Sequence, residues 1–161
     1  MLPACSRAPS GERAYSTTPF NSGRNYTLLA ALRLSGISAP LVIEGAAHTA
    51  VFEAYLRDVL GPTLLPSDLV VMDTVRFHKA ATIEPLIHLR GASILYLPPY
   101  APDFSPIEQA FTKLKQFLRR AKSTTFDTLL NAIADGLEAI SPSDALAWFI
   151  NCRFFNIDHA T

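Results

Sequence analysis

The fold of this chain is decided by residues 67–122, which read SDLVVMDTVRFHKAATIEPLIHLRGASILYLPPYAPDFSPIEQAFTKLKQFLRRAK. Near the start of this stretch, an uninterrupted apolar run within residues 67–73 ends in an acid, Asp73. A second apolar run occupies residues 92–100 and is cut off by two prolines. Continuous apolar runs of this length are typical of strands that are buried on both faces. The stretch therefore predicts two neighbouring buried strands.

Helices are predicted between and after these strands. Residues 81–91 have helical spacing, and Pro85 must lie in the first turn or kink the helix. A long helix is predicted from Pro106 to about Lys122. Because buried strands alternate with helices, we expect an α/β fold with a mixed sheet flanked by helices.

The surrounding sequence extends this layout in both directions. Two apolar runs around the Ser35-Gly36 break predict a β-hairpin, and a helix that stops at Gly61-Pro62 should follow it. We expect one main domain and two flanking segments, with these predicted ranges: an irregular segment 1–25 with a short strand near 13–17, hairpin strands 26–34 and 39–45, helices 48–60, 125–140 and 141–154, a main domain 26–154, and a tail 155–161.

The composition fits a globular domain more than a self-sufficient DNA-binding module. Hydrophobic residues make up 49% of the 161 residues and charged residues 17%, and 14 basic residues balance 14 acidic ones. A protein that binds DNA by itself is usually basic, because phosphate contacts supply much of the affinity. If this protein contacts DNA, its cationic groups must therefore be clustered, or the affinity must come from elsewhere. Cys5 and Cys152 are predicted to be reduced thiols, and without an apolar leader or membrane-length run we expect a soluble cytoplasmic protein.

Asp73 is the first candidate for chemistry. It ends a predicted buried strand, and open α/β sheets place their sites at the carboxyl ends of strands. A carboxylate in that position can ligate a metal ion. It can equally form a turn or cap the following helix, and the residues alone leave both roles open.

Glu108 is the second candidate. Ser105 is a good N-cap and Pro106 a good first helical residue, which makes Glu108 the third residue of the helix. Ser-Pro-Ile-Glu also matches a capping box, so Glu108 can serve the helix alone. Glu108 heads a row of polar side chains that all lie within about 40° of one line along the predicted helix. The basic members of this line form what we call the basic stripe: Lys115, Arg119 and Lys122.

The faces of that helix suggest two uses for the stripe. The predicted core face is formed by Ile107, Phe111, Leu114, Leu118 and Ala121, while Thr112 lies on the stripe's own line. An acid at the head of a basic stripe suits a metal ligand whose helix then follows a phosphate backbone. A solvated charged face would have the same pattern, so both interpretations stay open.

Spacing links the two acids. Thirty-four residues separate Asp73 from Glu108, enough for one helix and one strand, so both acids can converge on one cleft. Two carboxylates with a third can hold a pair of Mg²⁺ or Mn²⁺ ions, which stabilise the attacking and leaving oxygens of phosphoryl transfer. His78 and Lys79 follow Asp73 closely and are candidates for phosphate contacts, or for an ordinary polar loop. Glycine-rich phosphate loops, serine-hydrolase elbows and zinc motifs do not occur in the sequence.

These motifs together resemble a known family. VVMDTVRFHK followed by LYLPPYAPDFSPIEQAFTKLKQFLRR resembles the signature of DDE-type transposases, in the bacterial insertion-sequence branch of the mariner superfamily. The resemblance extends upstream through RAPSGERAYS, NYTLLAALRLSGI and LVIEGAAHTAVFEAYL, and so covers nearly the whole chain. It implies a ribonuclease H-like fold and metal-dependent cleavage and transfer of DNA strands at transposon ends. Asp73 would be the second catalytic acid and Glu108 the third.

The sequence departs from the family pattern in three places. The family's first catalytic aspartate ends a strand that should precede the segment beginning here at Leu2, and no residue matches it. Thr74 and Ser105 each stand where the family usually has Asn. The resemblance places the first strand centrally in the sheet, beside the strand that ends at Asp73. Without it, two strands would lose their backbone partners and expose apolar edges.

Three hypotheses follow from the sequence. The first is an N-terminally truncated transposase domain that is inactive alone, with DNA, a homo-oligomer or full-length transposase as partner. The second is a non-enzymatic module that regulates or binds full-length transposase. The third is a two-acid nuclease that takes a further ligand from Asp103, Glu44 or a partner. In the complete bacterial enzyme we expect a two-metal Mg²⁺ or Mn²⁺ site and association with the nucleoid during action.

Overall fold

The protein is described from a computed structural model, which describes residues 24–73, 81–98, 104–123 and 125–154. The short strand predicted near residues 13–17 lies outside these ranges. The helices and strands have the following order: β1 (Tyr26–Arg33), β2 (Gly36–Glu44), α1 (Thr49–Tyr55), β3 (Leu69–Met72), α2 (Ile83–His88), β4 (Ser93–Tyr96), α3 (Pro106–Ala121), α4 (Phe126–Glu138) and α5 (Pro142–Asn151).

The predicted hairpin is confirmed. Strands β1 and β2 pair antiparallel, from Tyr26 opposite Glu44 to Arg33 opposite Gly36. The second strand begins at Gly36, three residues earlier than predicted, because Leu34 and Ser35 alone make the turn. Gly36 has φ +116°, a conformation that costs glycine little and other residues much, so a tight turn forms there.

The predicted helix over 48–60 is only partly α-helical. Helix α1 ends at Tyr55, a π-helical turn covers Leu56–Leu60, and a 3₁₀ turn continues over Gly61–Thr63. The expected stop at Gly61-Pro62 is therefore wrong by one turn. Pro62 is accommodated because it lies in the first positions of the 3₁₀ turn, where its missing N–H is not needed.

Strands β3 and β4 form a parallel pair connected through α2. The register runs from Leu69 opposite Ser93 to Met72 opposite Tyr96, and the Leu97 N–H donates to the Met72 carbonyl at 2.8 Å. Pro85 is the third residue of α2 and thus lies in its first turn, as predicted. Each strand has four residues, so both are shorter than the apolar runs that predicted them.

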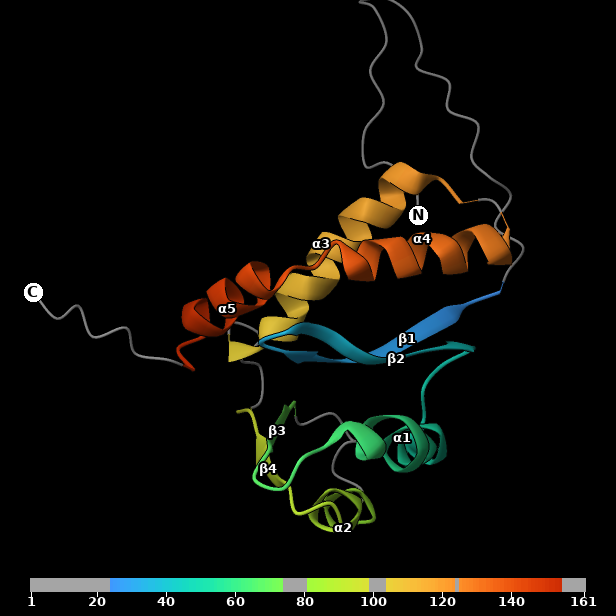
Figure 1. Cartoon of the computed structure of the whole chain (residues 1–161). Helices are drawn as coiled ribbons and strands as arrows, with labels where there is room; N and C mark the ends of the chain where they lie inside the picture. The colour runs from blue at the N-terminus through green and yellow to red at the C-terminus, as the bar shows by residue number, and fades with distance from the viewer. Residues whose placement is uncertain (1–23, 74–80, 99–103, 124, 155–161) are drawn as a thin grey trace, which may run out of the picture.

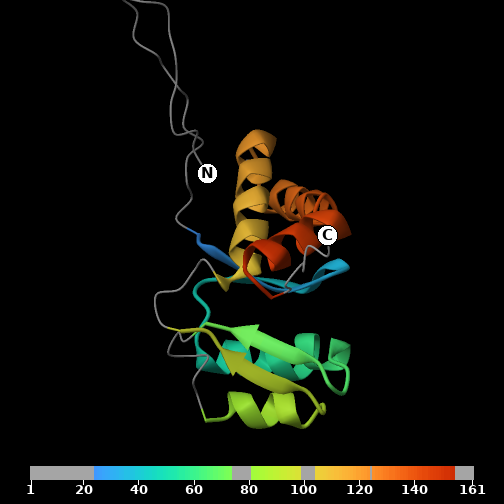
Figure 2. The same cartoon turned by 90° about the vertical axis from the view of Figure 1, so that its left-hand side faces the viewer.

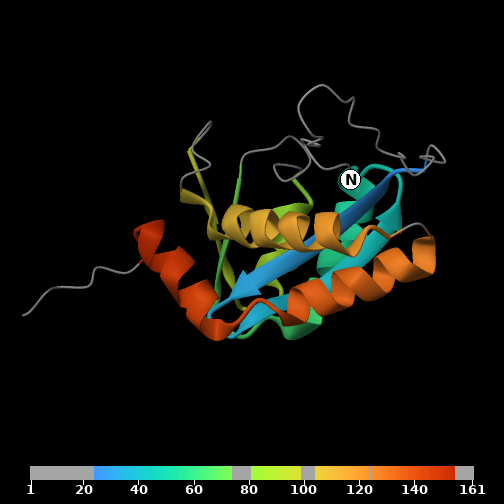
Figure 3. The same cartoon turned by 90° about the horizontal axis from the view of Figure 1, so that it is seen from above.

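The hairpin lies between two groups of elements, as Figures 1 and 2 show. Helices α3, α4 and α5 cover one side of it, which Figure 3 shows from above. On the other side lie α1, α2 and the β3–β4 pair. The main core lies there, between β3, α2 and the helical segment that α1 begins. It is formed by Phe52, Tyr55, Leu56, Leu60, Met72, Ile83, Ile87 and Ala92. Among the described residues, no strand ladder joins β1 to β3, so the strands form two separate two-stranded sheets.

The core face predicted for α3 needs correction. Leu114 is buried, but the other buried residues of the helix are Pro106 and Ala110. Ile107, Phe111 and Leu118 are half-buried, and Ala121 is exposed at the end of the helix. The inward face is centred on Ala110 and Leu114 because α4 crosses α3 there. A Cβ on Gly136 of α4 would lie 2.6 Å from Leu114 Cδ1.

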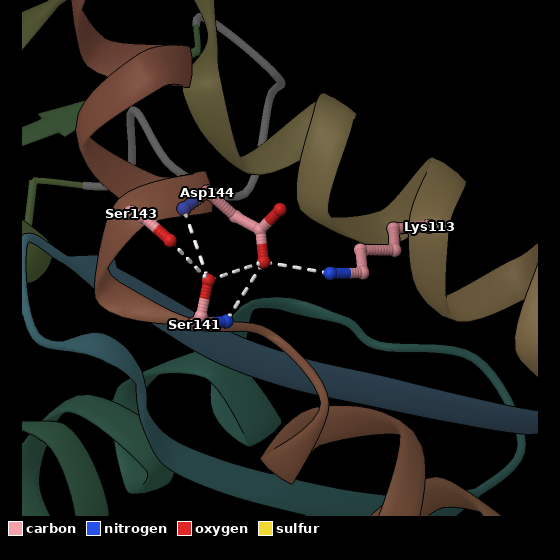
Figure 4. A network of polar contacts seen from close by, with 4 residues as sticks. All are labelled: Lys113, Ser141, Ser143 and Asp144. Carbon is pink, nitrogen blue, oxygen red and sulfur yellow. Dashed lines mark hydrogen bonds and ion pairs between the residues drawn. The ribbon is translucent and has the colours of Figure 1, made fainter.

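A polar network joins α3 to α5, and Figure 4 shows it. Lys113 Nζ lies 2.6 Å from Asp144 Oδ2, and the same oxygen accepts hydrogen bonds from the Ser141 hydroxyl and backbone N–H. Ser141 and Asp144 form a capping box at the start of α5. These contacts hold the pKa of Asp144 down at about 2, with the Lys113 bond as the largest cause.

None of the described helices is both long and apolar enough to cross a membrane.

Candidate active site

Asp73 lies where the chain leaves the parallel pair. The last ladder bond runs to the carbonyl of Met72, so the backbone of Asp73 is the first beyond β3. Its side chain is exposed. The predicted position at the carboxyl end of a strand is confirmed. Thr74, His78 and Lys79, which follow it, lie outside the described residues, and so does Asp103.

Glu108 lies in the first turn of α3, as predicted. Ser105 is the N-cap with extended backbone, Pro106 is the first helical residue, and Glu108 is the third. The Ser105 side chain makes no capping hydrogen bond, so the capping box that Ser-Pro-Ile-Glu predicted is wrong. Capping boxes do form at Thr125 of α4 and Ser141 of α5. Helix capping therefore does not account for the acid at position 108.

One cavity is lined by both acids. It has a volume of about 800 Å³ and extends between β1 and β3. The start of α3, which includes Glu108, also lines it. The structure thus brings Asp73 and Glu108 to the same cavity, although 34 residues separate them in the sequence.

The opposite end of the cavity holds an ion pair that sequence reasoning missed. Arg33 Nη2 at the end of β1 lies 2.7 Å from Asp68 Oδ2, just before β3. Arg33 also donates to the Thr63 carbonyl at 2.9 Å, and the Leu65 N–H donates to Asp68 at 2.9 Å. The Arg33 bond, followed by the Leu65 bond, lowers the pKa of Asp68. Asp68 is therefore a structural carboxylate.

The basic stripe is exposed on α3. Lys115, Arg119 and Lys122 are all exposed, and none forms an ion pair with another described residue. Lys122 closes the helix in a left-handed conformation with φ +48°. Lys113, on another line of the helix, is engaged by Asp144. The basic stripe is thus separate from the Lys113–Asp144 ion pair. Its side chains are compatible either with a solvated face or with phosphate contacts.

The two candidate ligands are of a chemical type that suits a divalent cation. Two carboxylates at one cavity provide hard oxygen ligands of the type that Mg²⁺ and Mn²⁺ prefer. Within the described ranges, however, no group of three or more His, Cys, Asp or Glu side chains converges. Glu44, one candidate for a third ligand, does not line the cavity and lies 3.4 Å from Arg24.

A sequence model described as DDE superfamily endonuclease matches residues 2–130. The chain belongs to this family. Its structure is similar to the Mos1 mariner paired-end complex with Mn (TM-score 0.71, 14% identity, covering 92% of this chain and 46% of that one) and to the Mos1 strand transfer complex (TM-score 0.72, 12% identity, 95% and 46%).

The Mos1 transposase catalytic domain, solved with raltegravir and Mg, gives a TM-score of 0.61 at 11% identity, covering 81% of this chain and 78% of that one. These likenesses confirm the α/β, ribonuclease H-like fold. The chain spans about half the length of the chains in the two Mos1 complexes. No curated protein matches the sequence.

Proposed function

We propose that this DDE superfamily chain is the larger part of a transposase catalytic domain from the bacterial insertion-sequence branch. In the complete enzyme, it would cleave and transfer DNA strands at insertion-sequence ends in a metal-dependent reaction. One observation carries the proposal: Asp73, at the end of β3, and Glu108, in the first turn of α3, line one cavity. The family membership and the Mos1-like fold support it.

The two carboxylates would hold Mg²⁺ or Mn²⁺. When bound, a pair of such ions would stabilise the attacking and leaving oxygens of phosphoryl transfer. Asp73 is positioned by the ladder that ends at Met72, and Glu108 by the Pro106 start of α3. Rigid supports of this kind keep two acidic ligands at a constant separation, which metal binding requires.

DNA would be held beside the acids by cationic groups. Lys115, Arg119 and Lys122 extend along α3 away from Glu108, so they can follow a phosphate backbone that enters the cavity. His78 and Lys79 are proposed as further contacts, because they follow Asp73 in the sequence. The Mos1 structures include complexes with transposon ends, and DNA is the corresponding partner proposed for this chain.

Manganese provides a direct test of the two ligands. Paramagnetic Mn²⁺ broadens backbone NMR signals near its site even when binding is weak, so we expect broadening around Asp73 and Glu108. Asp73→Asn and Glu108→Gln should each reduce it. The matched controls Asp135→Asn and Glu138→Gln change exposed acids of α4 that do not line the cavity. Broadening that the cavity variants leave unchanged would reject the proposed ligands.

We further propose that the isolated chain is inactive. Two carboxylates line the candidate end of the cavity, and the described residues bring no third ligand there. Supercoiled plasmid incubated with the chain and Mg²⁺ or Mn²⁺ should therefore stay intact. Robust nicking that Asp73→Ala abolishes would show instead that two acids suffice.

The second candidate function is a non-enzymatic module that binds full-length transposase. It is favoured by the edges of β1 and β3 that pair with no other strand in the described part of the chain, since unpaired strand edges readily accept another chain. Tagged chain expressed with intact transposase should recover it in a pull-down. Failure to recover it at matched expression would count against this candidate.

A further inference from the structure

A second hollow lies between α3 and α5, apart from the cavity that Asp73 and Glu108 line. It has a volume of about 310 Å³, near the lower limit of pockets that hold small organic groups. Four residues of α3 and one of α5 line it: Gln109, Thr112, Lys113, Gln116 and Trp148. None of them lines the larger cavity, so the hollow is a separate feature of the molecule.

Two contacts hold the walls of this hollow in place. Asp144, Trp148 and Cys152 follow one another at four-residue intervals, so they lie along one side of α5 and its C-cap. Lys113 Nζ lies 2.6 Å from Asp144 Oδ2, and Figure 4 shows the two side chains reaching toward each other from α3 and α5. The Gln109 amide donates to the Cys152 sulfur at 3.4 Å. Trp148 is therefore positioned between two fixed contacts, in a site that is formed in advance of any ligand.

The chemistry of the lining favours an uncharged planar ligand. The half-buried indole of Trp148 provides a flat apolar surface, while the other lining side chains are polar. Asp144 engages Lys113, so the lining residues offer no unpaired cation to a phosphate. Within the described ranges, the Gln116 amide has no hydrogen-bond partner, and the Gln109 amide uses only its nitrogen. The two amides can therefore offer donors and acceptors to the edge of a ring that stacks on the indole.

The basic stripe runs beside this hollow. At about 100° per residue, the α3 residues that line the hollow are centred roughly 90° around the helix from the line of the stripe. Thr112 lies on the line of the stripe and also lines the hollow, and Lys115 of the stripe directly precedes Gln116. On a helix about 10–12 Å wide, a quarter turn is roughly 9 Å along the surface. A DNA strand whose phosphates follow the stripe therefore has its bases within reach of the hollow.

We propose that the hollow between α3 and α5 binds one unpaired nucleobase of a DNA strand whose phosphates contact the basic stripe. Trp148 stacks on the base, and the amides of Gln109 and Gln116 bond to its edge. A base inside a duplex is already stacked and paired, so the ligand is a single strand or an unpaired position. The inference rests on the proposed function, in which DNA is the partner, and adds a contact to a base that the two acids do not make.

The fluorescence of Trp148 provides a direct test, because it is the only tryptophan in the chain. In metal-free buffer at low salt, an oligothymidylate of twelve nucleotides should quench this fluorescence as a base stacks on the indole. An oligomer with the same phosphates but abasic sugars should bind through the stripe without quenching, and roughly tenfold more weakly by fluorescence anisotropy. Equal affinity for the two oligomers, or tryptophan fluorescence that neither changes, would overturn the proposal.

Variants separate the base contact from the phosphate contact. Trp148→Leu should lower affinity for the oligothymidylate roughly tenfold and leave affinity for the abasic oligomer unchanged, whereas Trp148→Phe should retain part of the difference. Gln116→Ala changes an exposed residue, so it keeps the test decisive if Trp148→Leu does not fold, and it should cost about threefold for the oligothymidylate alone. The matched control Asn131→Ala, an exposed amide of α4, should cost nothing. Equal losses for both oligomers in the Trp148 and Gln116 variants would reject the base contact.

The outcomes also distinguish this inference from the proposed function. Arg119→Gln should weaken binding of both oligomers equally, because it removes a phosphate contact. If it does so while the fluorescence of Trp148 stays unchanged, DNA remains the partner and only the base site is wrong. If neither oligomer binds, the base site and the DNA contact are both wrong, and the Mn²⁺ test of the acids is unaffected. If free thymidine monophosphate binds as tightly as the oligothymidylate, the hollow is a mononucleotide site and its assignment to a DNA strand is overturned.

Discussion

Arg119 and Arg120 are adjacent and exposed in α3, but they point about 100° apart around the helix. Only Arg119 belongs to the basic stripe. If the stripe follows a phosphate backbone, Arg119→Gln should weaken binding of a random-sequence duplex and lower the slope of log affinity against log salt by about 0.9. Arg120→Gln is the matched control and should change neither. Fluorescence anisotropy at several low salt concentrations measures both quantities, and equal effects of the two variants would indicate a merely solvated face.

Asp144 supports a prediction about pH. Its pKa is lowered to about 2, mainly by Lys113 and then by Ser141. A carboxyl group whose pKa is lower in the folded state stabilises the fold above its unfolded pKa, about 3.9, and loses this contribution as the pH falls through the folded value. Asp144→Asn should therefore lower the melting temperature at pH 7. The difference from the parent chain should shrink between about pH 4 and pH 2. A difference that persists unchanged at pH 2 would show that shape, not charge, is responsible.

At the scale of elements, the crossing of α3 and α4 depends on the absence of a side chain at Gly136. A Cβ there would lie 2.6 Å from Leu114 Cδ1 and 3.1 Å from Phe117 Cδ1. Leu114 is only 3% exposed, so it has little room to move. Gly136→Ala gains helix propensity of about 1 kcal/mol but should still destabilise, because overpacking costs about 1–3 kcal/mol. Urea unfolding measures the net loss.

Two further variants show whether the crossing is the cause. Asn131→Ala changes an exposed position of the same helix and should be neutral or slightly stabilising. In a Leu114→Ala background, Gly136→Ala should cost less, because the side chain that it meets has been shortened. Equal costs in both backgrounds would mean that the two residues do not interact.

The elements also differ in how far the sequence could predict them. The hairpin, the parallel strand pair and the helices were predictable because the spacing of apolar residues, the positions of prolines and the helix caps are local signals. The π-helical turn over Leu56–Leu60 was not, since it breaks no local pattern. The capping box expected at Ser105 failed although boxes formed at Thr125 and Ser141. Ser105 and Ser141 are both followed by proline and by an acid three positions on, but ψ is 96° at Ser105 and 160° at Ser141, so the N-cap backbone differs where the sequence pattern is shared.

The same contrast between local features and long-range packing applies to the candidate site. Asp73 and Glu108 could be picked out as candidates because a strand end and a helix start are local features, and the structure places both on the wall of one cavity. The cavity itself depends on long-range packing between two sheets. So does the Arg33–Asp68 pair, whose members lie 35 residues apart and match no motif. Sequence reasoning therefore reached the acids but not the space around them.

At the scale of the whole molecule, no strand ladder among the described residues joins the two sheets, and the Arg33–Asp68 pair is a polar link between them. The side chains are 31% and 24% exposed, and Arg33 also bonds the Thr63 carbonyl. Arg33→Ala should therefore destabilise the fold by about 1–2 kcal/mol, a range between that of exposed ion pairs and that of charged hydrogen bonds. Because both sheets depend on this link, hydrogen exchange should rise in β1 and β3 together.

A second ion pair of the hairpin provides the control for this link. Arg24 and Glu44 lie 3.4 Å apart with side chains 64% and 57% exposed, and they do not bridge the sheets. Arg24→Ala should change stability little, because exposed pairs contribute little. A double-mutant cycle of Arg33→Ala and Asp68→Ala isolates the pair, and its coupling should fade below about pH 4 as Asp68, whose pKa is lowered, becomes protonated. Faster exchange confined to β1 would instead mean that the hairpin and the β3–β4 pair are held together by their shared apolar core, with the ion pair closing only the end of the cavity.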